Sequence, residues 1–364
     1  MQTPVVKSID RDFSSTRNKS DSAIAKWLFI LCGMVFFMVL LGGLTRLTHS
    51  GLSMVNWRPL LGWLPPIGHQ EWQFIFDLYK ETPEFKIINY DMTLDGFKSI
   101  FWLEYGHRLW GRLMGLAFIL PFTFFLAKGW VNRRLFCHLV IILLLGTSQG
   151  VLGWYMVKSG LVDNPDVSQY RLTAHLSVAF LIYGYMLWIA MSLLRFRGGA
   201  IAISRPKLLI SSICTLIWIF LTILSGGFVA GLDAGLTYNT FPLMDGQFIP
   251  DGLWKINPWY INLFENVTTV QFDHRIFAET TLLLVAVLWI ISRKTDMTNF
   301  ARKPFNALLI AVLAQVILGI VTLIFAVPVF FASLHQIGAI VLFTVSLWTV
   351  HSLFDNKNSF EVAK

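Results

Sequence analysis

Eight apolar runs, each long enough to cross a lipid bilayer, constrain the fold of this chain more than any other feature. A membrane-spanning helix needs about 20 mostly apolar residues. The predicted spans lie at residues 27–44, 105–127, 135–157, 173–194, 207–230, 272–292, 304–327 and 331–353. With 55% hydrophobic and only 14% charged residues among 364, the chain is too apolar for a soluble domain. We therefore expect an all-α integral membrane protein.

Basic residues are distributed by side of the membrane, which accounts for the formal net charge of +8 without nucleic acid as a partner. Cytoplasmic segments of membrane proteins are rich in lysine and arginine. Here these residues concentrate in the N-terminal tail 1–26 and in the connections that follow spans two, four and six. Both termini, including the tail 354–364, are predicted to be cytoplasmic. The long loop 45–103 is predicted to lie outside, because long loops translocate largely regardless of charge.

The three cysteines limit the chemistry that is open to this chain. Cys32, Cys137 and Cys214 lie in or beside apolar spans, and the sequence has no CxxC, CxxCH or zinc-type spacing. Disulfides, covalent haem attachment and thiolate metal sites are not expected.

The second half of the chain repeats landmarks of the first half in the same order. "GGLTRLTHSGLS" at residue 42 matches "GGFVAGLDAGLT" at 226, "EYGHR" at 104 matches "QFDHR" at 271, and "QGVLGW" at 149 matches "QVILGI" at 315. Each half contains four spans that begin and end inside, so the repeats are parallel. The sequence predicts two four-helix bundles, residues 27–195 and 207–353.

Four of the eight histidines occupy matched positions near the starts of the even-numbered spans. They are His107, His175, His274 and His335. Two facing imidazoles in a helix bundle can hold a haem iron from above and below. The pattern predicts two haem sites towards the outer side, His107 with His175 and His274 with His335. A packing role is the alternative for a single intramembrane histidine, but the matched pairs favour ligands. Zinc or copper is less suitable, because no thiolate or carboxylate recurs in both halves to complete the ligand set.

A carboxylate distinguishes the two predicted sites. Glu104 lies three residues before His107, on the same helix face, whereas its counterpart Gln271 cannot ionise. We expect a reactive site in the first half and an electron-transfer site in the second. The alternative for Glu104 is an ion pair with Arg108 or Arg112 at the span end.

Two arginines directly follow matched histidines. Arg108 and Arg275 could bind haem propionates through the guanidinium fork. The alternative is that each side chain reaches the membrane interface.

Two loop segments invite an interpretation. The stretch from Trp72 to Tyr79 has helical apolar spacing, which favours an amphipathic helix at the membrane surface, with a cover over the first site as the alternative. The turn-rich "YNTFPLMDG" at 238 suggests an ordered loop over the second site.

Taken together, these motifs resemble the haem A synthase family of alphaproteobacteria and mitochondria. The stretches that carry the resemblance are "GGLTRLTHSGLSMVNWRPLLGWLPP" at 42, "EYGHRLWGR" at 104, "GLTYNTFPLMDGQFIP" at 235, "FDHR" at 272 and "LHQIGAI" at 334. The resemblance implies oxidation of a ring methyl of haem O, through a hydroxymethyl stage, to the formyl group of haem A. That product serves haem-copper terminal oxidases.

The resemblance also implies roles for individual residues. His274 and His335 correspond to the axial ligands of a haem b cofactor, His107 and His175 to residues of the substrate-haem site, and Glu104 to the essential carboxylate. The outer-loop cysteine pair of Gram-positive members is absent from this sequence.

The same resemblance implies a protein of the inner, cytoplasmic membrane with haem O as substrate. It leaves haem O synthase, an electron acceptor and a second copy of the chain open as partners. A di-haem b-type cytochrome that exchanges electrons with quinone is the main alternative, since it would use the same histidines. A transporter is disfavoured because the ionisable residues gather at span ends.

Overall fold

The computed structural model describes residues 4–56, 62–162, 165–194 and 206–354, and this part of the chain is helical apart from loops and one isolated bridge. The long helices are α1 (Pro4–Leu47), α4 (Leu94–Ala127), α5 (Arg133–Ser159), α6 (Gln169–Leu193), α7 (Pro206–Gly231), α9 (Val267–Lys294), α10 (Asn299–Ile324) and α11 (Val329–Leu353). The short ones are α2 (Gly68–Lys80), α3 (Pro83–Ile87), α8 (Asn262–Glu265) and the 3₁₀ turns η1 (Ala234–Leu236) and η2 (Trp259–Ile261).

Within the described residues, eight helices are long and apolar enough to cross a membrane, as the apolar runs predict. The chain is a multi-pass membrane protein. Four of these helices begin at a residue whose side chain accepts the backbone N–H three positions further on, which satisfies a donor that the helix itself leaves unpaired. These residues are Thr93, Asn132, Asn266 and Thr298.

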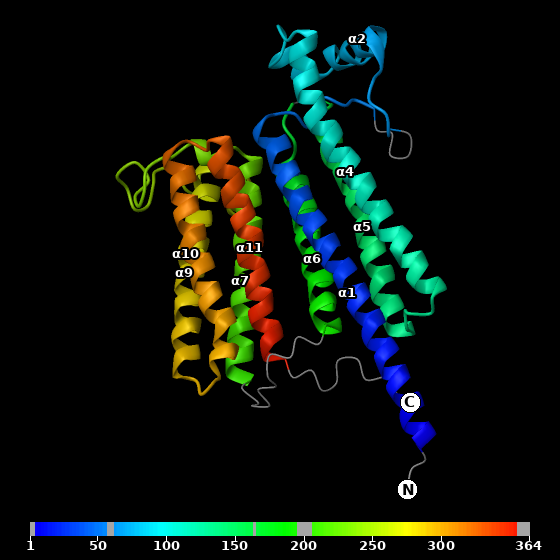
Figure 1. Cartoon of the computed structure of the whole chain (residues 1–364). Helices are drawn as coiled ribbons and strands as arrows, with labels where there is room; N and C mark the ends of the chain where they lie inside the picture. Colours follow the sequence, from blue (N-terminus) through cyan, green and yellow to red (C-terminus); the bar gives the residue numbers. More distant parts are fainter. Residues whose placement is uncertain (1–3, 57–61, 163–164, 195–205, 355–364) are drawn as a thin grey trace.

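The long helices lie in two groups of four, side by side (Figure 1). In the first group, α1 and α5 each contact α4 and α6. In the second group, α7 and α10 each contact α9 and α11. The groups meet where α6 packs on α7 and α11, and where α1 packs on α11. The side on which α2 lies, at the top of Figure 1, is called the α2 end below.

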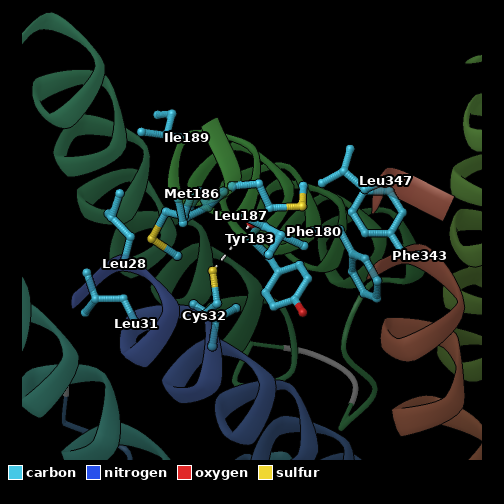
Figure 2. Packing of buried hydrophobic residues seen from close by; sticks show 14 of the residues in the cluster. Leu28, Leu31, Cys32, Phe180, Tyr183, Met186, Leu187, Ile189, Phe343 and Leu347 are labelled. Atoms are coloured by element: carbon cyan, nitrogen blue, oxygen red, sulfur yellow. Dashed lines mark hydrogen bonds between the residues drawn. The ribbon is translucent and has the colours of Figure 1, made fainter. Parts of the chain in front are cut away.

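The apolar core is centred on the junction between the groups. Figure 2 shows Leu28, Leu31 and Cys32 of α1 facing a run of α6 side chains, with Phe343 of α11 on the far side. The phenyl rings of Phe180 and Phe343 meet edge to face, with centroids 5.4 Å apart. Because Phe180 belongs to the first group and Phe343 to the second, this buried contact helps to hold the two groups together.

A polar contact and an ion pair also join the groups. The Tyr183 hydroxyl of α6 lies 2.7 Å from the Thr344 hydroxyl of α11. Near the α2 end, the Arg46 guanidinium of α1 pairs with Asp233 beyond α7 at 2.8 Å and donates to the Ala230 carbonyl. This arginine lies at the C-terminal end of α7, where a positive charge is favourable.

Two long helices differ from the predicted spans. The first begins at residue 4 and not at 27, so most of the predicted N-terminal tail is helical. The second begins at Leu94 and not at 105, because the added residues Phe97 and Phe101 have apolar partners on α2. The remaining spans begin or end within about five residues of the helices.

The long loop 45–103 is largely folded. α2, α3 and residues 94–105 form a unit, here called the α2 cap, around the buried side chains Phe76, Tyr79, Phe97, Phe101 and Tyr105. The rings of Tyr79 and Phe97 lie 5.0 Å apart. The helical spacing at residues 72–79 is therefore confirmed as α2, and its apolar side packs on α4.

Some predicted features lie outside the described residues. They are residues 57–61 of the long loop, the basic residues Arg195, Arg197 and Arg205, and all but the first residue of the tail 354–364. Among the histidines without a repeat counterpart, His138 contacts the Tyr185 hydroxyl and His351 the Ser192 hydroxyl at 3.1 Å. Both contacts join neighbouring helices.

Candidate functional site

The four matched histidines lie on α4, α6, α9 and α11, and each ring lies against a glycine of a neighbouring helix. The Cε1 atom of each ring would lie 2.9 to 3.6 Å from a Cβ added to that glycine. The pairs are Gly42 with His107, Gly153 with His175, Gly226 with His274 and Gly319 with His335. A Cβ at Gly153, Gly226 or Gly319 would push on the imidazole, whereas one at Gly42 would make ordinary contact with it. The missing Cβ therefore lets each ring occupy space directly beside the neighbouring backbone.

The structure brings together the members of each predicted pair. His107 lies close enough to His175 for their charges to interact, and the same holds for His274 and His335. All four rings are half-buried between the surrounding helices. A neutral imidazole is the form that binds iron.

Two glutamines hold the histidine backbones and were not singled out from the sequence. The Gln149 amide donates to the His175 carbonyl, and the Gln315 amide donates to the His335 carbonyl, both at 3.0 Å. The sequence does contain a signal for them, because each glutamine is the first residue of a matched stretch, "QGVLGW" or "QVILGI". Each glutamine ties the histidine helix to the preceding helix at the level of the ring.

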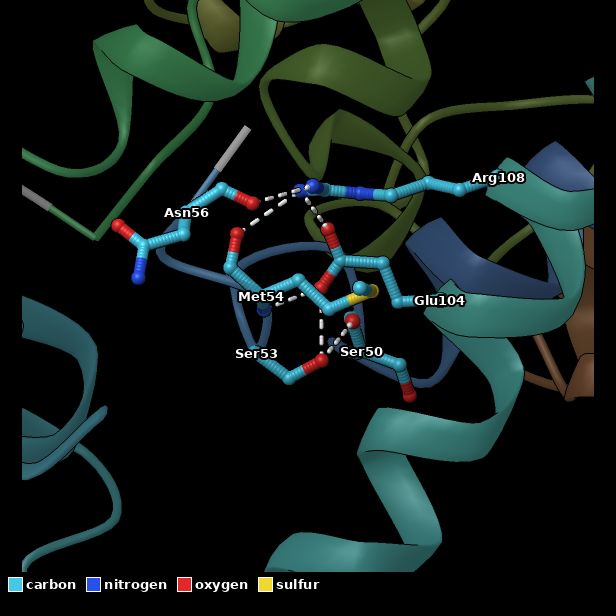
Figure 3. A network of polar contacts seen from close by, with 6 residues as sticks. All are labelled: Ser50, Ser53, Met54, Asn56, Glu104 and Arg108. Carbon is cyan, nitrogen blue, oxygen red and sulfur yellow. Dashed lines mark hydrogen bonds and ion pairs between the residues drawn. The ribbon is translucent and has the colours of Figure 1, made fainter. Parts of the chain in front are cut away.

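Glu104 is buried and bonded to the chain that enters the long loop (Figure 3). Its Oε2 atom accepts from the Ser53 hydroxyl at 2.6 Å and from the Met54 backbone N–H at 2.8 Å. Its Oε1 atom accepts from Arg108. The ion pair with Arg108, which was the alternative reading of this residue, is therefore present. A carboxylate offers about four acceptor positions, so Oε1 keeps capacity for one further donor.

The arginines after His107 and His274 make the same kind of contact. Arg108 donates to the carbonyls of Met54 and Asn56 at 2.9 and 3.3 Å. Arg275 donates to the carbonyls of Tyr238 and Thr240 at 2.9 and 2.8 Å. In both cases the guanidinium spans two carbonyls of the segment that follows the glycine-rich helix end. The nitrogens expected to bind propionates are thus largely occupied by loop carbonyls.

Gln271, the counterpart of Glu104, reaches the same segment with the opposite polarity. Its amide nitrogen donates to the Tyr238 carbonyl at 3.0 Å, while its oxygen is buried without a partner among the described residues. Glu104 accepts where Gln271 donates. The loop "YNTFPLMDG" is therefore tied to α9 through Arg275 and Gln271, beside His274.

A second buried carboxylate lies in the α2 cap near Glu104. Glu84 is 3% exposed and accepts from the Tyr79 hydroxyl at 3.0 Å, and that hydroxyl accepts from the Asn89 amide at 2.8 Å. Burial raises the pKa of Glu84 to about 7; the hydrogen bond from Tyr79 opposes the shift and the negative charge of Glu104 adds to it. No periodic or repeated pattern points to Glu84, since the cap has no counterpart in the second half.

A haem suits these residues better than a bare metal ion does. Among the described residues, no group of three or more His, Cys, Asp or Glu side chains could hold a metal ion, so a closed zinc site lacks ligands. A haem needs only two axial nitrogens, which each histidine pair offers. In addition, the Nε atom of Arg275 is buried without a hydrogen-bond partner among the described residues, which suits a propionate oxygen.

Comparison with known proteins agrees with this arrangement. Residues 25–347 match the family model COX15-CtaA, described as cytochrome oxidase assembly protein. The chain belongs to the COX15-CtaA family. A protein of Nitrosospira multiformis named heme A synthase is 53% identical over 332 residues, which cover 91% of this chain and 93% of the relative. A heme A synthase of Paramagnetospirillum magneticum is 47% identical over 348 residues, covering 93% and 96%. The mouse protein heme A synthase COX15 is 43% identical over 356 residues, covering 92% and 83%.

Proposed function

We propose that this protein is a haem A synthase, which oxidises a ring methyl group of haem O through a hydroxymethyl stage to the formyl group of haem A. The observation that best supports this proposal is 53% sequence identity to a protein of that name over nearly the whole of both chains. The matched histidine pairs add a chemical reason, because they offer two places for a haem in one chain. The proposal makes the protein an oxidoreductase whose product serves haem-copper oxidases.

The proposed architecture consists of two parallel repeats, residues 27–195 and 207–353. Three matched contacts support it: a glycine against each histidine ring, a glutamine on the carbonyl of His175 and of His335, and an arginine across two loop carbonyls. Neighbouring helices also correspond, since α1 contacts α4 and α6 as α7 contacts α9 and α11. With the basic connections inside, the α2 end faces outward and both termini face the cytoplasm of an inner-membrane protein.

The histidine pairs are proposed to divide two roles. His274 and His335 hold a haem b cofactor in the second repeat, and Arg275 contributes its free Nε atom to a propionate. His107 and His175 receive the substrate haem O in the first repeat, near Arg108. When bound, haem b would supply a one-electron acceptor.

Glu104 is proposed to be the catalytic carboxylate. Both oxidation stages remove hydrogen from the same methyl carbon of the porphyrin and develop positive charge there, which a nearby carboxylate can stabilise. It can also take the proton from an attacking water. Ser53, Met54 and Arg108 hold the carboxylate in one position, and Oε1 keeps acceptor capacity for that proton. Gln271 has no charge to offer, which agrees with a cofactor role for the second site.

The proposed partners follow from the reaction. Haem O and the lipid bilayer are required by it. Haem O synthase as the supplier, a protein or quinone electron acceptor, and a second copy of the chain remain predictions from the resemblance. The di-haem b-type cytochrome is the less favoured alternative, because relatives that span most of this chain are named heme A synthase.

The test is the identity of the haems that the protein makes. The chain is expressed in a host that supplies haem O but forms no haem A, and extracted haems are identified by mass. Wild type is expected to yield haem A, whereas Glu104→Gln and His274→Ala are expected to yield little or none. Glu81→Gln, which changes an exposed carboxylate of the α2 cap, is the control and should match wild type. A wild-type protein that holds haem but forms neither hydroxymethyl nor formyl haem would support the cytochrome instead.

A further inference from the structure

Among the residues that the structure describes, one of the four histidine rings has a side-chain hydrogen-bond partner. The Ser225 hydroxyl of α7 lies 2.8 Å from the Nδ1 atom of His274. Ser225 directly precedes Gly226, the glycine that lies against the same ring. The serine and the glycine therefore position one imidazole from the same turn of α7.

The groups around Nδ1 of His274 favour a proton on that nitrogen. The Ser225 hydroxyl donates its single hydrogen to the Thr222 carbonyl at 2.7 Å, so towards His274 it can only accept. The Thr222 carbonyl, which also can only accept, faces the same ring. Nδ1 is therefore protonated in the neutral ring. The lone pair is left on Nε2, the nitrogen that is free to bind iron.

The other three rings lack this arrangement. In the matched stretches, the residue before the glycine pair is Ser225 in the second half and Leu41 in the first. A leucine offers His107 no acceptor. The Nδ1 atoms of His175 and His335 are buried without a hydrogen-bond partner among the described residues, although the Gln315 carbonyl lies near the His335 ring. Within the described chain, His274 is thus the ring with both its tautomer and its orientation fixed by a side chain.

We infer that Ser225 is a positioning residue that makes His274 a fixed axial donor and so distinguishes the site that retains its haem from the site that exchanges it. Hydrogen bonds to the second nitrogen of a ligating histidine fix the ring and increase its basicity. A cofactor must remain bound through many turnovers, whereas a substrate haem must enter and leave. This division of the two sites rests on the proposed function, while the effect of Ser225 on His274 does not.

The experiment measures haem b retained by the purified full-length protein, together with its low-temperature electron paramagnetic resonance spectrum and its midpoint potential. Ser225→Ala is expected to lower haem retention by about tenfold, the low end of the effect of such partners. Its potential should rise, since the ring becomes a weaker donor to the ferric iron. Ser225→Thr keeps the hydroxyl and should restore all three properties.

Two further variants make the result specific. Ser148 of α5 also donates to a carbonyl three residues earlier, that of Leu145 at 2.7 Å, so Ser148→Ala is the matched control and should match wild type. Leu41→Ser places a hydroxyl beside His107, and it should slow the release of haem from the first site.

The outcomes separate this inference from the proposed function. If Ser225→Ala keeps the wild-type haem content, spectrum and potential, the inference is overturned. If Ser148→Ala loses haem to the same extent as Ser225→Ala, the loss reflects helix stability and the inference is again overturned. A wild type that retains haem b but makes no haem A would overturn the proposed function and leave the Ser225 measurement standing.

Discussion

Replacing Glu104 by glutamine should loosen the start of the long loop by a predictable amount. Glutamine keeps the shape of the side chain, and its oxygen can still accept from Ser53 and Met54. Its amide nitrogen, however, would face the donors of Arg108 in place of an acceptor. The ion pair is lost, while Arg108 keeps its bonds to the loop carbonyls.

The size of the effect follows from that single lost contact. A hydrogen bond to a charged group contributes about 1.5 to 3 kcal/mol. Since 1.4 kcal/mol corresponds to a factor of ten, opening of the segment should become roughly 10- to 150-fold more frequent. The Met54 amide, which donates to Glu104, reports that opening directly.

Hydrogen exchange followed by mass spectrometry is the assay, on peptides that cover residues 50–56 of the purified protein. Glu104→Gln should accelerate exchange there and leave peptides from α10 unchanged. Glu81→Gln is the control, because the Glu81 pair with Lys86 is exposed and such pairs contribute little. Unchanged exchange in Glu104→Gln, or equal acceleration in both variants, would refute the reasoning that this buried carboxylate holds the segment.

Two further predictions concern the α2 cap and the histidine sites. Because burial raises the pKa of Glu84 to about 7, Glu84 keeps a proton in the folded cap that it releases when the cap opens. The contribution of this proton to the stability of the folded cap is complete below about pH 4.5. It is lost as pH rises through 7, which lowers the free energy of opening by up to about 3 kcal/mol. Limited proteolysis between pH 5 and 8 should show this loss, and Glu84→Gln should abolish the pH dependence. Gly319→Ala places a Cβ 2.9 Å from His335 Cε1, which should cost about 1 to 3 kcal/mol of overpacking and lower the haem content of the purified protein. Gly33→Ala, with nothing within 4 Å of its added Cβ, should retain wild-type haem, and equal losses in both variants would contradict this account.

The long helices could be predicted because each is a continuous apolar run, a signal that needs no knowledge of tertiary contacts. The start of α4 could not, since Phe97 joins the helix through its contact with Tyr79, and such a partner is invisible to a hydropathy window. The spacing of residues 72–79 indicates that α2 is a helix. It does not indicate that its apolar side meets α4 and not lipid.

The candidate site shows the same division between local and distant signals. Matched motifs locate His107 and His274 together with their neighbours Arg108 and Arg275, because these residues are adjacent in sequence. The partners of Glu104 lie about fifty residues away, and the repeated stretch that contains Ser53 does not indicate that it contacts this carboxylate. Ser225 acts on His274 across two helices, and only the folded chain reveals which hydroxyl faces the ring.

The arginine contacts have a consequence for how the loops of this protein can vary. Arg108 fixes the chain at Met54 and Asn56, and Arg275 fixes it at Tyr238 and Thr240. Beyond these carbonyls the described parts of the two loops differ: one builds the α2 cap, and the other continues through a β-bridge and short turns. Each arginine thus fixes the first residues of a loop to the helix that carries the histidine. Insertions and deletions beyond the carbonyls that the arginine binds can accumulate without changing the path of the chain beside the histidines.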